Sequence, residues 1–192
     1  MIPKNTKKIM LYLLRNLELV NINQISQKLD ISVGSAFKIL KNLEENKIIK
    51  SNRLGNAVFY QINFNSEEAI KLCELLLIEE RRILKGYPKL YADEIKDFKD
   101  AELIILFGSV LNNKEFNDVD ALFLTNKVKE TTKFCLNLYK IRTKPVVPLI
   151  LTKDDLIKEI NNKKEAIISI LKTGVILKGE SIFIDVIKNA KN

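Results

Sequence analysis

Residues 31–49 read ISVGSAFKILKNLEENKII, and this stretch decides the fold of the first third of the chain. Ser32 is a suitable helix N-cap, because its hydroxyl can accept a hydrogen bond from a backbone N–H of the first turn. The apolar residues that follow recur at helical spacing and form one inward stripe: Ala36, Ile39, Leu40 and Leu43. We therefore predict a helix that begins at Ser32 and ends near Asn46.

Two further helices are predicted ahead of this stretch. The first runs to Leu17 with Thr6 as its N-cap, and its apolar residues again share one face: Ile9, Met10, Leu13, Leu14 and Leu17. The second is short, with Asn23 as its expected cap and Asp30 at its end, and its inner face consists of Ile25 and Leu29. The second and third helices then meet at a tight turn.

A small β-hairpin is predicted after the third helix. Residues 48–50 and 57–62 are rich in apolar and β-branched side chains, which favour strands. The segment 51–56 between them is the expected turn, with Gly55 and Asn56 as its turn residues.

Three helices followed by a hairpin is the plan of a winged helix-turn-helix, and residues 6–63 resemble that family. Residues 31–49 are similar to the recognition helix of bacterial and archaeal winged-helix regulators, which implies double-stranded DNA as the partner. Small or polar residues at the start of such a helix enter the major groove, lysines on its outward face pair with phosphates, and the hairpin reaches the backbone or the minor groove. The residues assigned to DNA contact are Ser32, Gly34, Ser35, Lys38, Lys41, Arg53 and Asn56.

The distribution of charge agrees with a polyanionic partner. Residues 1–66 hold ten Lys and Arg against four Asp and Glu, whereas residues 67–100 hold seven against nine. Small helix-and-hairpin modules also bind other proteins without nucleic acid, and surface lysines are often simply solvated. Both alternatives stay open at the level of sequence.

A long amphipathic helix is predicted over residues 66–86, with Ser66 as its cap and Glu67 and Glu68 in its first turn. Its apolar stripe suits either a homodimer contact or packing on the segments that the helix joins. Gly86-Tyr87-Pro88 is expected to break the helix and to mark a domain boundary.

Two buried strands are predicted in the second half of the chain. The first, 103–107, ends in Gly108-Ser109, and the second, 119–124, is opened by Asp118-Val119-Asp120. An apolar strand, Gly-Ser, a spacer and Asp-x-Asp resemble the signature of the nucleotidyltransferase superfamily, in the minimal form common in archaea and bacteria. The similarity extends over residues 90–190, whose ending resembles archaeal proteins that fuse such a domain to a helix-turn-helix.

This resemblance implies a Mg²⁺-nucleoside triphosphate site. Gly108 would let the backbone approach the phosphates, Ser109 would donate a hydrogen bond to them, and Lys114 is the nearest cation. Asp118 and Asp120, two apart on a strand, point to one face, where they would bind the metal and serve as the catalytic carboxylates.

The chain departs from that family at several positions. The strand 146–151 carries no third carboxylate, and Asp154 and Asp155 just after it suit a helix start. The basic residue and the glycine that usually follow Gly-Ser are missing, and the spacer is short. Loss of a general base lowers a transfer rate by about 10²-fold or more. We therefore expect the site to bind nucleotide even where it transfers the nucleotide slowly.

The chain as a whole limits the remaining options. It has no His and only two isolated cysteines, which excludes His-based catalysis and the usual zinc sites, and both cysteines are expected to be buried without a disulfide. No apolar run is long enough for a membrane helix, and no signal peptide is visible, so we expect a cytoplasmic protein.

The predicted fold is α+β, with a winged helix-turn-helix at 1–65, a connecting helix at 66–86 and a nucleotidyltransferase-like mixed sheet with flanking helices at 87–192. Three functions follow from it. The first is a DNA-binding transcriptional regulator whose second domain binds Mg²⁺-nucleotide. The second is an active transferase that moves a nucleotide to a protein, small-molecule or nucleic-acid hydroxyl. The third is an interaction module of the toxin-antitoxin kind.

Overall fold

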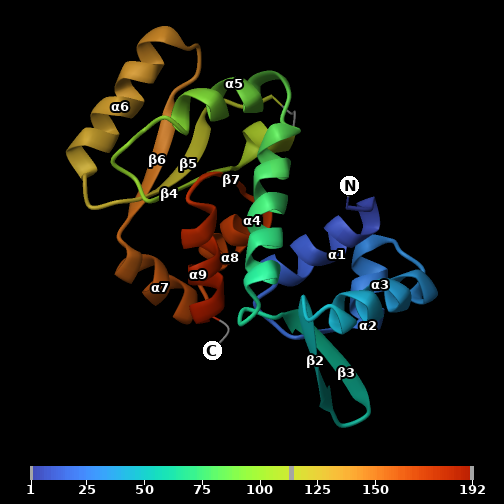
Figure 1. Ribbon diagram of the computed structural model, residues 1–192. Coiled ribbons are helices and arrows are strands. Elements are labelled where there is room, and N and C mark those ends of the chain that lie inside the picture. Colours follow the sequence, from blue (N-terminus) through green and yellow to red (C-terminus); the bar gives the residue numbers. More distant parts are fainter. Residues whose placement is uncertain (1, 113–114, 191–192) are drawn as a thin grey trace. The chain divides into compact units, whose positions relative to one another are not determined.

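The computed structural model describes residues 2–112 and 115–190 (Figure 1). The chain divides into two compact units, of which one holds Met1–Leu76 with Ile187–Asn192 and the other holds Leu77–Val186. The division therefore falls inside the segment 66–86, which the sequence predicts as a connecting helix. Each unit contains helices and one sheet, so the fold is a mixture of α and β structure.

The first unit begins with three helices, α1 (Lys4–Arg15), α2 (Ile22–Leu29) and α3 (Val33–Glu45). The expected cap of α1 was wrong, because the helix begins after Pro3 and Thr6 lies in its first turn. The expected cap of α2 was wrong as well. Asn21 caps α2: its Oδ1 accepts from the Gln24 N–H at 3.1 Å while Gln24 Oε1 accepts from the Asn21 N–H at 2.8 Å.

The turn between α2 and α3 is set by two residues. Asp30 adopts the left-handed conformation, with φ 52°, and ends α2 as predicted. Ser32 then caps α3, since its Oγ accepts from the Ser35 N–H at 3.3 Å. Three of the four apolar residues expected to face inward are buried, and Ile39 is half-buried. The sequence therefore predicted both ends of α3 correctly.

The hairpin of the first unit is longer than predicted. Strands β2 (Ile49–Leu54) and β3 (Ala57–Ile62) pair antiparallel, and β1 (Val20–Asn21) pairs on the other side of β3. Only Gly55 and Asn56 remain in the turn, with Gly55 at φ +59°. Residues 51–54 were expected in the turn but belong to β2, because a two-residue turn that follows the strand twist lets the ladder continue to Leu54 opposite Ala57.

Helix α4 (Glu67–Arg82) is shorter than predicted. Ser66 is at its start as expected, with its Oγ accepting from the Ala69 N–H at 3.2 Å. The helix ends at Arg82, and Ile83 beyond it is 74% exposed. Gly86-Tyr87-Pro88 does not break this helix but begins the next one, α5 (Gly86–Ile95), since proline is compatible with the first turn of a helix.

The second unit is built on a four-stranded mixed sheet of order β6-β5-β4-β7. The strands β4 (Leu103–Phe107) and β5 (Val119–Leu124) lie where the sequence predicts them and pair antiparallel. Strand β6 (Val146–Leu151) runs parallel to β5 at one edge, with Pro148 opposite Ala121, and β7 (Val175–Lys178) pairs antiparallel with β4 at the other edge.

Helices cover both faces of this sheet (Figure 1). On one face, α5 and α6 (Val128–Ile141) pack against the inward side chains of β4 and β5, in a core that includes Tyr91, Ile104 and Phe123. On the other face, α7 (Lys153–Asn161) packs on β6 and α8 (Glu165–Thr173) packs on β4. Helix α9 (Glu180–Ala190) follows β7, and a short 3-10 turn, η1 (Ser109–Asn112), follows β4. Within the described residues, no helix has the length and apolar character that crossing a bilayer would need.

Candidate nucleic-acid interface and nucleotide site

The leading end of α3 is open to solvent. Ser32 and Gly34 are exposed and Ser35 is half-buried. A Cβ added at Gly34 would meet no atom within 4 Å, so the fold itself does not need glycine at this position. An incoming macromolecule could therefore approach the α3 backbone closely here.

Two lysines project from the exposed part of α3. Lys38 forms no ion pair among the described residues, and Lys41 lies 3.9 Å from Glu45 Oε1. Both side chains of that pair are more than half exposed, at 63% and 61%. Exposed pairs of this kind are worth roughly 0 to 1 kcal/mol, so Lys41 is readily available to another anion.

The hairpin carries the other residues assigned to DNA contact. Asn56 lies in the turn, whereas Arg53 lies on β2 opposite Val58, one residue pair away from the turn. The expectation that Arg53 belongs to the turn is therefore corrected. Both side chains are exposed, so they remain at the outer end of the hairpin.

Two exposed apolar residues on α3 were not assigned from the sequence. Val33 is 49% exposed and Phe37 is 53% exposed, and they are one helical turn apart. A signal for Phe37 was present in the sequence, because it falls outside the inward stripe of Ala36, Leu40 and Leu43. An aromatic side chain in that position must either face solvent or contact a partner.

In the second unit, Gly108 and Asp120 are brought into direct contact. Gly108 adopts φ +83°, a conformation that side chains rarely tolerate. A Cβ built on it would lie 2.2 Å from Asp120 Oδ2 and 3.1 Å from Asp120 Cγ. Glycine is therefore required here both by the backbone conformation and by the carboxylate packed against it.

Asp118 and Asp120 lie close enough for their charges to interact. Asp118 directly precedes β5, and Asp120 is its second residue, opposite Phe107 of β4. Partial burial raises the pKa of Asp120, and the negative charge of Asp118 raises it further. A bound cation would offset the repulsion between the two carboxylates, so Asp118 and Asp120 are residues that could hold one.

The remaining residues assigned to the nucleotide are less defined. Ser109 begins η1 beside Gly108 and is half-buried, and Lys114 lies outside the described residues. Within the part of the chain that the structure describes, no three Asp, Glu, Cys or His side chains gather into a metal-binding group. Asp118 and Asp120 would thus need phosphate or water oxygens to complete a metal shell.

The strand next to the acid pair places an apolar residue beside it. The parallel register of β5 and β6 puts Val147 opposite Asp120, and the Val147 side chain is 44% exposed. Asp155 serves in a capping box: its Oδ2 accepts from the Thr152 hydroxyl at 2.6 Å and from the Thr152 N–H at 3.1 Å. These hydrogen bonds lower the pKa of Asp155. Its carboxylate is thus engaged at the start of α7, in a capping box whose N-cap is Thr152.

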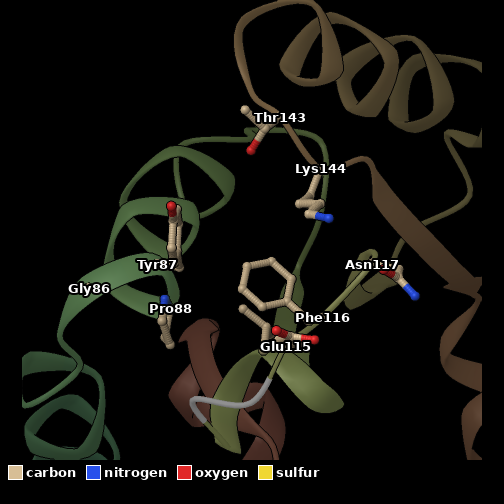
Figure 2. A pocket seen from close by; sticks show the side chains of 9 residues that line it. Gly86, Tyr87, Pro88, Glu115, Phe116, Asn117, Thr143 and Lys144 are labelled. Carbon is tan, nitrogen blue, oxygen red and sulfur yellow. The ribbon is translucent and has the colours of Figure 1, made fainter.

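A hollow of about 570 Å³ lies between the start of α5, residues 115–117 ahead of β5, and Thr143 and Lys144 ahead of β6 (Figure 2). Phe116 lies centrally in it, and the Tyr87 ring meets Phe116 edge to face at 5.6 Å. The backbone of Lys144, which lines the hollow, is fixed by the buried Tyr91, whose hydroxyl donates to the Lys144 carbonyl at 3.0 Å and accepts from the Lys144 N–H at 3.2 Å. Glu115 and Lys144 add one charge of each sign to the lining.

A second hollow of about 470 Å³ includes Gly108 and is closed by α8, which contributes Ser169 and Thr173. Gly108 thus lies where a ligand in this hollow would meet the backbone next to Asp120.

Comparisons with known proteins find a partial similarity to solved structures. No family model matches the chain, and no curated protein matches it. One structure of a Lactococcus lactis ZitR mutant is 23% identical, with a TM-score of 0.38, over 52% of this chain and 64% of that chain. Another ZitR mutant is 18% identical, with a TM-score of 0.37, over 73% of this chain and 75% of that chain. The chain thus spans about two thirds of the length of these ZitR chains.

Proposed function

We propose that the chain is a DNA-binding transcriptional regulator that reads double-stranded DNA with α3 and the β2–β3 hairpin. The observation that supports this most is the exposed N-terminal end of α3. No atom lies within 4 Å of where a Gly34 Cβ would be, and the exposed Lys38 and Lys41 follow one and two helical turns later. A basic segment with a small-residue helix start and an exposed hairpin fits a major groove flanked by phosphates.

The roles within this interface follow from side-chain chemistry. Ser32 and Ser35 carry hydroxyls that can donate to and accept from base edges, and Gly34 permits close approach of the backbone. Lys38 and Lys41 would pair with phosphates along the groove. Arg53 and Asn56 would contact the backbone or the minor groove from the outer end of the hairpin.

The second unit supplies a binding function in the same proposal. Gly108 and Ser109 would approach the phosphates of a nucleotide, with Lys114 as a further cation, while Asp118 and Asp120 would hold Mg²⁺. When bound, the metal would neutralise phosphate charge. Val147 opposite Asp120 favours binding over transfer, since a base at that position would be needed to activate an attacking hydroxyl.

Two other functions remain as distinct hypotheses with distinct readouts. An active nucleotidyltransferase would label a hydroxyl acceptor when incubated with Mg²⁺ and radiolabelled triphosphate, and Asp118→Asn would abolish the label. An interaction module of the toxin-antitoxin kind would form a stable complex with a partner protein and show neither DNA binding nor transfer. A homodimer and a cytoplasmic location stay predictions.

The test of DNA binding is a salt series on duplexes enriched by the protein from a random pool. On logarithmic axes, the wild-type association constant should fall linearly with salt concentration. Lys38→Gln or Arg53→Gln should each reduce the steepness of this line by about 0.9, the value for one lost phosphate contact. Lys133→Gln removes the same charge from an exposed position on α6 of the other unit and serves as the matched control. If no duplex binds with salt dependence, or if all three variants behave alike, the proposal is wrong.

A further inference from the structure

The apolar side chains on the exposed surface of α3 are the least expected feature of the first unit. Val33 and Phe37 are 49% and 53% exposed, although the helix has a complete inward stripe without them. Single exposed apolar side chains are common on protein surfaces, but Val33 and Phe37 are neighbours one helical turn apart, and adjacent apolar side chains rimmed by polar ones mark an interaction site.

Their neighbours on the helix restrict what that partner is. Phe37 is three residues after Gly34 and four before Lys41, so the three form one row along the helix surface. Gly34 leaves the surface open on one side of the ring, and the Lys41 ammonium, which forms an exposed pair with Glu45, lies on the other. An apolar group next to an accessible cation suits a partner that carries an apolar group next to an anion.

DNA offers that pairing in the major groove. Thymine is the base that carries a methyl group there, and the phosphates that flank it lie within reach of a lysine from the same helix. Apolar side chains, phenylalanine included, recognise thymine through this methyl group. A second protein would also accept an apolar ring, but the surrounding positive charge favours the nucleic acid.

Resting on the DNA-binding function proposed above, we infer that Phe37, supported by Val33, contacts the C5 methyl group of a thymine and so selects a thymine at one position of each bound site. Phe37 is thereby a specificity-determining residue, whereas Lys38 and Lys41 contribute affinity without regard to sequence. The methyl group loses its contact with water on binding, which is the source of the preference.

The experiment replaces thymine by deoxyuridine, which removes only the methyl group and leaves base pairing intact. A duplex enriched by the wild-type protein is prepared with each thymine replaced in turn, and binding is measured by fluorescence anisotropy. We expect one position of the bound site at which deoxyuridine weakens wild-type binding about three- to fivefold, the value of one buried methyl group. With Phe37→Ala, thymine and deoxyuridine at that position should bind equally.

Two control variants distinguish this contact from other effects. Lys38→Gln should weaken all duplexes by the same factor and keep the deoxyuridine effect. Leu54→Ala removes an equally exposed apolar side chain from the hairpin and should also keep it. Because Phe37 is about half exposed, its alanine variant should fold, which circular dichroism checks.

The outcomes separate this inference from the proposal on which it rests. Salt-dependent binding with no deoxyuridine effect, or with an effect that persists in Phe37→Ala, overturns the role of Phe37 and leaves the DNA-binding function standing. Absence of any salt-dependent binding overturns both. If Phe37→Ala instead abolishes association with a second protein and leaves DNA binding unchanged, the ring belongs to a protein interface and the inference is refuted.

Discussion

Two glycines of this chain should respond in opposite ways to the same substitution. At Gly108, an added Cβ would lie 2.2 Å from Asp120 Oδ2, on a backbone with φ +83°. At Gly34, within α3, the same Cβ would meet no atom within 4 Å. Gly108→Ala therefore adds a methyl group that clashes with Asp120, whereas Gly34→Ala adds the same methyl group without a steric clash.

The magnitudes follow from the two local structures. A left-handed backbone costs a non-glycine residue about 1 to 2 kcal/mol, and turning the Asp120 side chain away from its rotamer costs about 0.5 to 1.5 kcal/mol more. Gly108→Ala should therefore destabilise the second unit by about 1.5 to 3.5 kcal/mol. Gly34→Ala should stabilise the first unit by roughly 0.5 to 1 kcal/mol, since alanine is the better helix former.

The assay is urea or thermal unfolding followed by circular dichroism and tyrosine fluorescence, because the chain has no Trp. The double variant Gly108→Ala/Asp120→Ala separates the two causes, since it removes the clashing oxygen and leaves the backbone cost. Its destabilisation should be smaller than the sum of the single effects. Equal unfolding midpoints for Gly108→Ala and wild type, or strict additivity in the double variant, would refute the contact between Gly108 and Asp120.

Three further predictions concern the second unit. The pKa of Asp120 is raised in the folded protein, so its ionisation destabilises the fold as pH rises from the ordinary value of 3.8 through the raised one. Asp120→Asn should then increase the unfolding midpoint at pH 7 and flatten its dependence on pH; an unchanged profile would contradict the shift. Val147→Asp places a carboxylate opposite Asp120 at a half-exposed position, so calorimetry should detect tighter Mg²⁺ binding than in wild type, with Asp118→Asn in the same background reversing the gain. Tyr91→Phe leaves the Lys144 backbone without its hydroxyl partner and should cost about 1 to 3 kcal/mol in urea unfolding, whereas a loss below about 0.3 kcal/mol would contradict a stabilising role of these two hydrogen bonds.

Local signals in the sequence predicted most of the first unit. The stripe of α3 and its Ser32 cap are short-range features, and both are found as expected. The cap of α2 was also readable, because Asn21 is followed three residues later by Gln24, the pattern of a capping box, whereas Asn23 is not. Asn23 is followed three residues later by Ser26, which is not the Glu or Gln of that pattern.

Other features depend on contacts between distant residues and could not be read from one sequence. Gly86-Tyr87-Pro88 suits the end of one helix as well as the start of another, and only packing of α5 on the sheet decides between them. The absence of an acid on β6 was visible in the sequence. That Val147 in particular lies opposite Asp120 required the register of two strands joined by a whole helix.

Proline at the edge of the second sheet has a consequence for the behaviour of the protein in concentrated solution. Strand β6 is an edge strand, and Pro148 at its third position offers no N–H to a strand from another molecule. The opposite edge, β7, is only four residues long. Polymers that grow by adding strand to strand would therefore find poor templates at both edges of this sheet, a form of protection against aggregation that is independent of any ligand.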